Sequence, residues 1–249
     1  MEQMKTDRPE NPSRRNFFKS GAAAVTLTLA PGVTVMAFGG SAAHAAADAG
    51  TRWGLLIDVN KCASDCTACV SACKDENGWE GHGDPEQAAQ WIRKITLKDK
   101  ATGHETSLPM MCQHCEKPPC VDVCPTGASF KRNDGIVLVD KHICIGCRYC
   151  MMSCPFKARS FVHEPTTNQK APAPRGQGTV ESCTLCVHRV DEGRIPACVE
   201  ACDATGNSAM VFGDLNDPES EISKALAAYP STALRADLDL NQGVRYLNL

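Results

Sequence analysis

Sixteen cysteines constrain the fold of this chain more than any other feature of its sequence. They form four groups with none left over: Cys62, Cys66, Cys69 and Cys73; Cys112, Cys115, Cys120 and Cys124; Cys144, Cys147, Cys150 and Cys154; and Cys183, Cys186, Cys198 and Cys202. Such a pattern predicts that the thiols meet in sets, as disulfides or around metal. Aromatic residues make up only 5% of the sequence, so bound metal would supply cross-linking that a thin hydrophobic core lacks.

The third group has the most specific spacing. It reads CIGCRYCMMSCP, which is the bacterial ferredoxin pattern C-x2-C-x2-C-x3-C-P for a cubane iron–sulfur cluster. Two intervening residues let the first three thiolates converge on one cluster, while the fourth points away and binds a different cluster. Pro155 closes the run because it lacks an N–H and disfavours helix at the residue before it.

The other three groups vary this spacing. The second reads C-x2-C-x4-C-x3-C-P, and the prolines 118–119 stiffen its longer gap. In the fourth, eleven residues separate Cys186 from Cys198, and a small hairpin can close that loop at modest entropic cost. The first group has three residues between Cys62 and Cys66, an extra residue that a bulge in the loop can absorb.

Zinc and disulfides are the alternatives to iron–sulfur clusters. Four-cysteine zinc sites use two C-x2-C hooks joined by a longer loop, which the third group does not resemble. Many cysteines would ordinarily indicate disulfides if the chain is exported, as its N-terminal segment described below predicts. Attached haem is disfavoured because no C-x-x-C-H occurs, and the net charge of −3 does not indicate nucleic-acid binding.

Residues 1–45 have the pattern of a twin-arginine signal peptide. Arg14 and Arg15 form the arginine pair, an apolar stretch follows over 21–38, and an A-x-A site predicts a mature start near Ala46. Proline and glycine interrupt the apolar stretch, which makes a transmembrane anchor the weaker alternative. The twin-arginine route exports folded proteins with their cofactors, so clusters could be assembled in the reducing cytoplasm.

Short apolar segments flank the cysteine groups. We expect strands at Trp53–Val59 and Ile136–Val139 before the first and third groups, and at Ala158–His163 and Ala209–Phe212 after the third and fourth. An Asp-Gly turn joins 128–131 to the strand at 136 as a hairpin. The predicted fold class is therefore α+β, with two nested double-cubane bacterial ferredoxin-like modules and inserted hairpins and loops.

The remaining segments complete the predicted domain organisation. We predict a signal peptide at 1–45, a four-cluster domain at 46–215 (inner module about 108–163, outer module about 53–75 plus 179–213, insertion 74–111) and a C-terminal helix and tail at 216–249. The insertion contains a hairpin of Trp91–Leu97 and Glu105–Met110, and 164–178 form a surface loop. Asp217 is the expected N-cap of a helix that ends near Ala228.

The ligand exchange of two-cluster ferredoxins predicts which thiolates share a cluster. Four [4Fe–4S] clusters would be held by Cys112, Cys115, Cys120 and Cys154; by Cys144, Cys147, Cys150 and Cys124; by Cys62, Cys66, Cys69 and Cys202; and by Cys183, Cys186, Cys198 and Cys73. The second and third groups thus pair in the inner module, and the first and fourth in the outer module. No catalytic residue is predicted.

With these groups and the export signal, the chain resembles the four-cluster ferredoxin-like electron-transfer subunits of molybdopterin oxidoreductases and related membrane complexes. The likeness covers about 53–212, and MMCQHCEKPPCVDVCPTGAS is its most specific stretch. Within that family, KCASDCTACVSAC and CIGCRYCMMSCPFKARSF resemble exported subunits of DsrMKJOP-type complexes of sulfur metabolism. The resemblance implies a non-catalytic electron-transfer subunit, periplasmic and peripheral on the membrane.

The same resemblance implies partner subunits. They are an NrfD-type membrane subunit that interacts with quinone (DsrP-like), a multihaem cytochrome c (DsrJ-like), and DsrM-like and DsrK-like subunits, with no nucleic acid. One alternative is the beta subunit of a molybdopterin polysulfide, tetrathionate or nitrite reductase. Another is an exported structural protein held by disulfides.

A few other side chains are weaker candidates. His114 lies between two predicted ligands and could donate a hydrogen bond to a sulfur, or belong to an exposed loop. Lys61 and Lys141 could stabilise thiolate charge, although solvated lysines are commoner. The tryptophans, Trp53, Trp79 and Trp91, are expected to serve packing.

Overall fold

The structure is a computed structural model, and it describes residues 25–30, 33–37, 48–80, 87–167 and 169–249. The chain divides into two units, residues 1–46 and 47–249. In the first unit, β1 (Val25–Ala30) and β2 (Val33–Ala37) pair antiparallel. The predicted arginine pair and cleavage site lie outside the described residues. Among the described helices, none has the length and apolar character needed to span a membrane.

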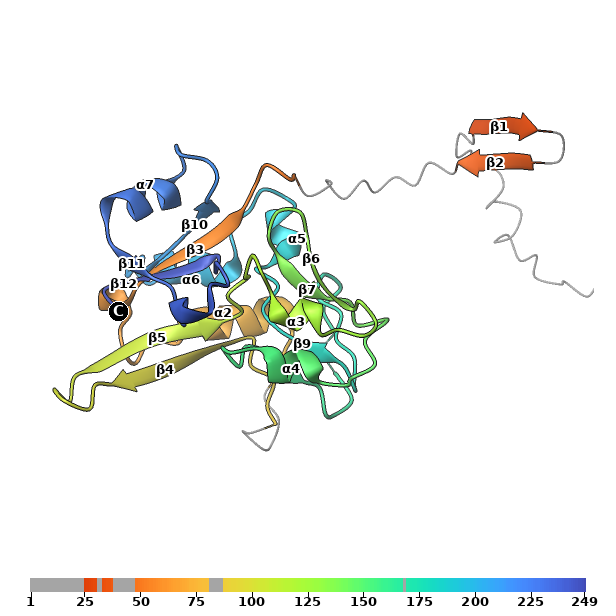
Figure 1. The fold of residues 1–249 in the computed structure, drawn as a ribbon. Coiled ribbons are helices and arrows are strands. Elements are labelled where there is room, and N and C mark those ends of the chain that lie inside the picture. The colour runs from red at the N-terminus through yellow and green to blue at the C-terminus, as the bar shows by residue number, and fades with distance from the viewer. Residues whose placement is uncertain (1–24, 31–32, 38–47, 81–86, 168) are drawn as a thin grey trace, which may run out of the picture. The chain divides into compact units, whose positions relative to one another are not determined.

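The second unit is α+β and contains a four-stranded sheet with the order β10–β3–β12–β11 (Figure 1). As predicted, β3 (Trp53–Asp58) enters the first cysteine group and β10 (Met210–Asp214) follows the fourth. These two strands pair antiparallel, which joins the two outer cysteine groups. On the other side of β3, β12 (Val244–Leu247) pairs in parallel and carries the edge strand β11 (Ser231–Thr232). The tail after residue 230 is therefore part of the sheet, which the sequence did not predict.

Helices pack on this sheet. Side chains alternate along a strand, and Leu55 and Ile57 of β3 join the hydrophobic core that includes cysteines of α2 (Ala68–Asn77) and α6 (Ala197–Ala204). Helix α7 (Glu221–Ala228) packs against β10 and β3. A Cβ at Gly213 would lie 2.9 Å from Cγ2 of Ile222, so this close approach requires glycine.

The start of α7 corrects one prediction. The N-cap is Ser220, whose hydroxyl accepts a hydrogen bond from the backbone N–H of Ser223 at 3.2 Å. Asp217 instead accepts from the backbone N–H of Glu219 and stabilises the turn before the helix. The prediction of Asp217 as N-cap was wrong because this turn places the helix start three residues later; the predicted end near Ala228 is confirmed.

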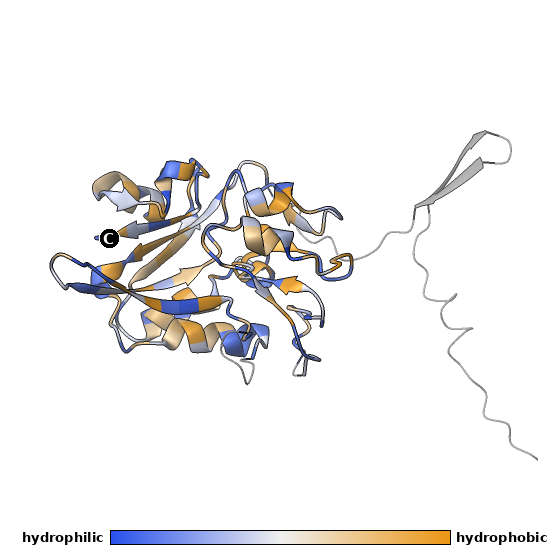
Figure 2. Ribbon diagram, turned by 60° about the horizontal axis from the view of Figure 1, so that its bottom comes forward, coloured by the Kyte–Doolittle hydropathy of each residue, from blue (hydrophilic) through white to orange (hydrophobic). Residues whose placement is uncertain are grey.

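Three two-stranded elements surround the cysteine groups. The predicted hairpin of the insertion is confirmed as β4 (Ile92–Lys98) and β5 (Glu105–Met111), and its tip is hydrophilic (Figure 2). The Asp-Gly hairpin is confirmed as β6 (Ser129–Lys131) and β7 (Val137–Val139), with Gly135 at a φ of +86°. Strand β8 (Ser160–Phe161) is shorter than predicted and pairs with β9 (Val180–Glu181).

The short helices bring the cysteine groups together in pairs. Helix α3 (Pro119–Asp122) of the second group packs against α4 (Tyr149–Ser153) of the third. Helix α2 of the first group packs against α6 of the fourth. The remaining helical turns are η1 (Val59–Lys61), α5 (Val187–Val190) and η2 (Ala236–Leu238). Each of the two larger cores consequently contains cysteines as well as apolar side chains.

Candidate metal centres

All sixteen cysteines lie in the described part of the chain and all are free thiols, so no disulfide joins them. Only Cys147 is exposed. Within the described residues, no three His, Cys, Asp or Glu side chains are arranged to hold a single metal ion, as zinc would require. A cubane binds each thiolate at a different iron, and it therefore suits thiols that lie further apart.

The first candidate centre is a cavity between the second and third cysteine groups. It is lined by four buried cysteines, Cys112, Cys115, Cys120 and Cys154, which we call the Cys112 set. Proline and apolar side chains make up most of the remaining wall, together with Gln113 and Arg159. Three of these cysteines come from the second group and the last from the third.

A second cavity is the counterpart of the first. Its cysteines are Cys144, Cys147, Cys150 and Cys124, which we call the Cys144 set. The loop that carries Cys144, Cys147 and Cys150 turns at Gly146, where φ is +69° and an added Cβ would lie 2.2 Å from the backbone oxygen of Gly178. Glycine at this position therefore lets the ligand loop approach the connector before β9.

The outer groups form the third and fourth candidate centres. Cysteines 183, 186, 198 and 73, the Cys183 set, line a cavity between α2, α6 and the loop after β9. The Cys62 set comprises cysteines 62, 66, 69 and 202. Burial is the main cause of the raised pKa of Cys69, and the three other thiols of the set contribute to it. A turn with a hydrogen bond from the Cys66 N–H to the Ala63 oxygen absorbs the additional residue of the first group.

The packing of the cysteines indicates which sets are neighbours. Cys69 of the Cys62 set and Cys198 of the Cys183 set belong to one hydrophobic core, and Cys112 and Cys150 of the other two sets belong to the second. Cys183 packs against both cores, and Cys112 contributes to the rise in its pKa, of which burial is the main cause. This packing indicates the order Cys62, Cys183, Cys112 and Cys144, with the partly exposed sets at the two ends.

Several N–H groups donate hydrogen bonds to the sulfurs. Trp79 Nε1 lies 3.2 Å from Cys73 Sγ, Lys94 Nζ lies 3.0 Å from Cys62 Sγ, and Arg159 Nη2 lies 3.1 Å from Cys120 Sγ. Backbone N–H groups donate in the same way to cysteines 124, 183 and 202. Donors of this kind stabilise thiolates, which are the form that binds metal.

Other buried donors near the sets have no protein partner. Trp91 Nε1 and Arg159 Nη1 are buried and unpaired, and both residues line cysteine cavities. His114 accepts a hydrogen bond at Nδ1 from the Val137 N–H at 3.1 Å, which leaves its proton on a buried, unpaired Nε2. Unpaired buried N–H groups are costly, and the inorganic sulfides of a bound cluster would accept from them. The residues present therefore fit an iron–sulfur cluster.

Burial controls the protonation of the thiols. It raises the pKa of Cys112, Cys115 and Cys73 to about 12 and that of Cys69 to about 11, with neighbouring thiols contributing. At Cys124, burial also raises the pKa, but hydrogen bonds led by the Ser129 N–H outweigh it and the pKa is lowered. The buried thiols are thus neutral without metal, and binding of iron would release their protons.

Some weaker sequence candidates have different surroundings from those expected. His114 is buried rather than in an exposed loop. Trp79 both packs and donates to a sulfur, whereas Trp53 stacks on Phe212 as a packing residue. Lys141 Nζ lies 5.4 Å from the centre of the Trp91 ring, and Lys61 is an exposed residue near Asp58.

The sequence did not indicate Lys94 or Arg159 as neighbours of the sulfurs. Lys94 lies on β4, about thirty residues from the cysteine that it contacts. Arg159 follows the third group closely but contacts a cysteine of the second. A basic residue just after a C-x3-C-P run was the only local signal for Arg159.

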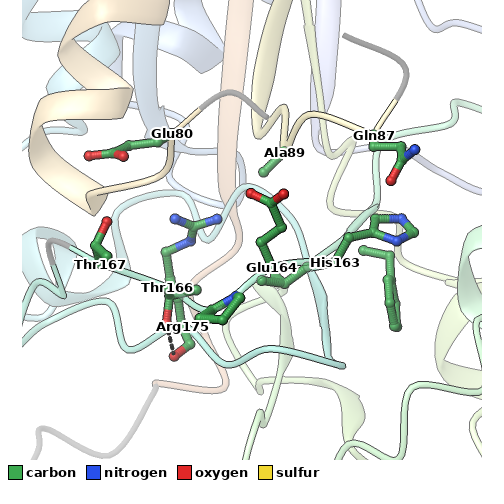
Figure 3. Close-up of a pocket in the computed structure, with 11 residues that line it drawn as sticks. Glu80, Gln87, Ala89, His163, Glu164, Thr166, Thr167 and Arg175 are labelled. Carbon is green, nitrogen blue, oxygen red and sulfur yellow. Dashed lines mark hydrogen bonds between the residues drawn. The ribbon is translucent and has the colours of Figure 1, made fainter. Parts of the chain in front are cut away.

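A separate surface pocket of about 240 Å³ contains none of the cysteines (Figure 3). Its polar residues include Glu80, His163, Glu164 and Arg175, and a hydrogen bond joins Thr166 to the backbone oxygen of Arg175. The guanidinium of Arg175 forms a buried ion pair with Glu181, with 2.8 Å between Nη2 and Oε1. Arg175 therefore has a structural role beside this pocket, at the base of the connector.

Comparison with known proteins agrees with this geometry. Residues 104–215 match the family model described as a 4Fe–4S dicluster domain. The chain is 44% identical over 226 residues to the Hdr-like menaquinol oxidoreductase iron–sulfur subunit 1 of Archaeoglobus fulgidus, covering 80% of this chain and 84% of that protein. It belongs to this family of iron–sulfur subunits.

Two further relatives of this chain are named as subunits of reductases. One is a putative dimethyl sulfoxide reductase iron–sulfur subunit of Halobacterium salinarum, 38% identical over 218 residues, or 80% of this chain and 79% of that one. The other is a tetrathionate reductase subunit of Salmonella typhimurium, 38% identical over 182 residues, or 70% and 63% of the two chains. The chain is accordingly an electron-transfer protein that binds 4Fe–4S clusters.

Proposed function

We propose that this iron–sulfur protein holds four [4Fe–4S] clusters, one at each cysteine set, in two nested double-cubane modules. The observation that carries the proposal is the grouping of the thiols: three cavities are each lined by four cysteines from two distant groups. The mutual effects within the Cys62 set support a fourth site of the same kind. A cubane, when bound, takes up and releases one electron at a time.

The row of sets suits electron relay. The two middle sets are mostly buried, so the protein excludes water from them, while Cys147 at one end is exposed and Cys62 and Cys66 at the other are partly exposed. Electrons can enter at one end and leave at the other without a substrate pocket between them. We therefore assign no catalytic residue and regard the subunit as a non-catalytic electron carrier.

The two ends present different surfaces. Beside the Cys144 set, Ile145, Tyr149 and Met152 are 67%, 57% and 76% exposed. The loop of the Cys62 set instead exposes polar residues such as Asp65. Exposed apolar residues in a cluster favour an interface with another protein, so we propose that the Cys144 end docks on a membrane subunit and the Cys62 end meets a more polar redox partner.

We further propose that the subunit is the counterpart of DsrO in a DsrMKJOP-type complex of sulfur metabolism. Its partners would be DsrP-like, DsrJ-like, DsrM-like and DsrK-like subunits, of which the DsrP-like one is an NrfD-type membrane protein. The twin-arginine pattern supports export in the folded state to the periplasm. The name of the A. fulgidus relative, a menaquinol oxidoreductase subunit, supports a role in exchange of electrons with quinol.

A second candidate is the beta subunit of a molybdopterin reductase. The similarity to the tetrathionate reductase subunit favours it. The chemistry of the subunit would be unchanged, but its polar end would meet a molybdenum catalytic chain. Purifying the complex through a tag on this chain and identifying the co-purified subunits by mass spectrometry distinguishes the two candidates.

Iron and acid-labile sulfide analysis of the anaerobically purified complex tests the proposal itself. Four cubanes require about sixteen irons and sixteen sulfides per subunit, and EPR during reduction should resolve four spin systems. Replacing Cys147 by Ser should alter one of them and leave the others. Material that lacks iron, or that contains it at a single site, would overturn the proposal.

A further inference from the structure

Arg159 has an unusual position for an arginine. It lies just after the third cysteine group and is only 5% exposed. Its Nη2 donates to Cys120 Sγ at 3.1 Å and to Ser129 Oγ at 2.8 Å. Its Nη1 is buried and has no hydrogen-bond partner. The described residues thus offer this buried cation a thiol and a hydroxyl, but no carboxylate hydrogen-bonded to it.

The guanidinium lies between two ligand sets. Cys120 belongs to the Cys112 set, and Arg159 lines the cavity of that set. Ser129, the other acceptor of Nη2, lines the cavity of the Cys144 set, and its backbone N–H donates to Cys124 Sγ of that set at 3.3 Å. The guanidinium therefore contacts a thiol of one set directly and lies one residue away from a thiol of the other.

A buried cation needs a compensating negative charge. Four thiolates around a cubane give each loaded set a net negative charge, and reduction adds one electron and one further negative charge. A nearby cation stabilises the reduced form more than the oxidised form, and the low dielectric of a buried site strengthens this effect. Net charge and hydrogen bonds to sulfur are the features that set cluster potentials.

We propose that Arg159 is a shared charge for the Cys112 and Cys144 sets, raising the reduction potentials of both bound clusters together. Arg159 is a positioning residue in this role, since it acts through the thiolates. The proposal rests on the proposed function, because it requires clusters at both sets. It goes beyond that function by assigning the two sets a common electrostatic control.

Lys94 provides a matched comparison at the other end of the row. Its Nζ donates to Cys62 Sγ at 3.0 Å and to the Ala63 oxygen at 2.7 Å, and it contacts one set only. It is also closer to solvent than Arg159, so water screens its charge more strongly. Removing Lys94 should consequently lower the potential of the Cys62 set alone, and by less.

The test uses redox-titrated EPR on the purified complex carrying Arg159→Gln, Arg159→Lys or Lys94→Met, with iron content measured on every sample. Arg159→Gln is expected to lower the equilibrium constants for reduction of the clusters at the Cys112 and Cys144 sets by at least tenfold, which lowers each of these two inner potentials by about 59 mV for one electron. The constants of the other two clusters should change by less than threefold. Arg159→Lys retains the charge but cannot reach both sets as the guanidinium does, so one inner potential should fall more than the other.

The outcomes separate this proposal from the proposed function. Too few irons in the unmodified complex would refute the four-cluster assignment, whatever the variants do. Full iron content with unchanged inner potentials in Arg159→Gln would overturn the role of Arg159, as would an equal shift of all four potentials. If Arg159→Gln loses iron, Arg159→Lys with iron retained decides: an unequal fall of the two inner potentials supports the proposal, and any other pattern refutes it.

Discussion

Replacing Gly146 by alanine tests how closely the ligand loop of the Cys144 set must approach the connector. The residue has a φ of +69°, and an added Cβ would lie 2.2 Å from the backbone oxygen of Gly178 and 3.1 Å from Cε2 of Phe161. Gly127 is a matched control, because its φ is also +69° but nothing lies within 4 Å of an added Cβ. It follows Cys124 of the same set, so both substitutions act near one site.

The left-handed backbone alone costs an L residue about 1–2 kcal/mol, which is the full effect expected for Gly127→Ala. In Gly146→Ala, displacement of packed backbone adds about 1–3 kcal/mol, as overpacking does in cores. For a domain of this size, 1 kcal/mol shifts the Tm by about 2–4 °C. Gly146→Ala should therefore melt about 2–12 °C below Gly127→Ala.

The assay is thermal unfolding at one scan rate under anaerobic conditions, followed by circular dichroism and by the visible absorbance of the clusters. A fixed scan rate matters because loss of clusters makes unfolding irreversible. Equal melting temperatures for the two variants would refute the argument from close approach. A lower melting temperature for Gly127→Ala would contradict it more strongly.

Three further predictions follow from contacts described above. Trp79→Phe removes the N–H donor to Cys73 Sγ and should lower the potential of the Cys183 set by up to about 59 mV; an unchanged potential in an EPR titration would contradict this. Glu181→Gln breaks the buried ion pair between Glu181 and Arg175, whose side chains are 0% and 6% exposed, respectively. It should lower the free energy of unfolding, measured by heat or denaturant, by about 3–5 kcal/mol, whereas breaking the exposed pair of Lys224 and Glu219 should lower it by less than 1 kcal/mol. Removing iron with a chelator should abolish the compact fold, since cysteines form part of both larger cores, and a native circular dichroism spectrum of the apoprotein would argue otherwise.

The sequence predicted those parts of the fold that depend on local pattern. The hairpin at the Asp-Gly turn before Ile136 and the hairpin of Trp91–Leu97 and Glu105–Met110 were both predicted, and the structure confirms them. Helix α3 packs on α4 and α2 packs on α6, an arrangement that is compatible with the predicted pairing of the cysteine groups. Whether each set binds a cubane stays a prediction until iron is counted.

Features that depend on distant partners were missed. The parallel pairing of β12 with β3 joins residues nearly 190 positions apart, and the polar tail around β12 gives no strong strand signal. Lys94 and Arg159 contact sulfurs of groups other than their nearest neighbours in the sequence. The N-cap of α7 was misplaced because Asp217 and Ser220 are both good caps, and only the tertiary turn decides between them.

The position of β12 in the sheet has a consequence for biosynthesis. The strand that precedes Cys62 gains its parallel neighbour only when residues 244–247 have left the ribosome. The Cys112 and Cys144 sets, by contrast, are complete once residue 154 has been translated. Vectorial synthesis thus allows the thiols of the Cys112 and Cys144 sets to come together first, while the four-stranded sheet that joins the two outer cysteine groups can close only after β12 has been made.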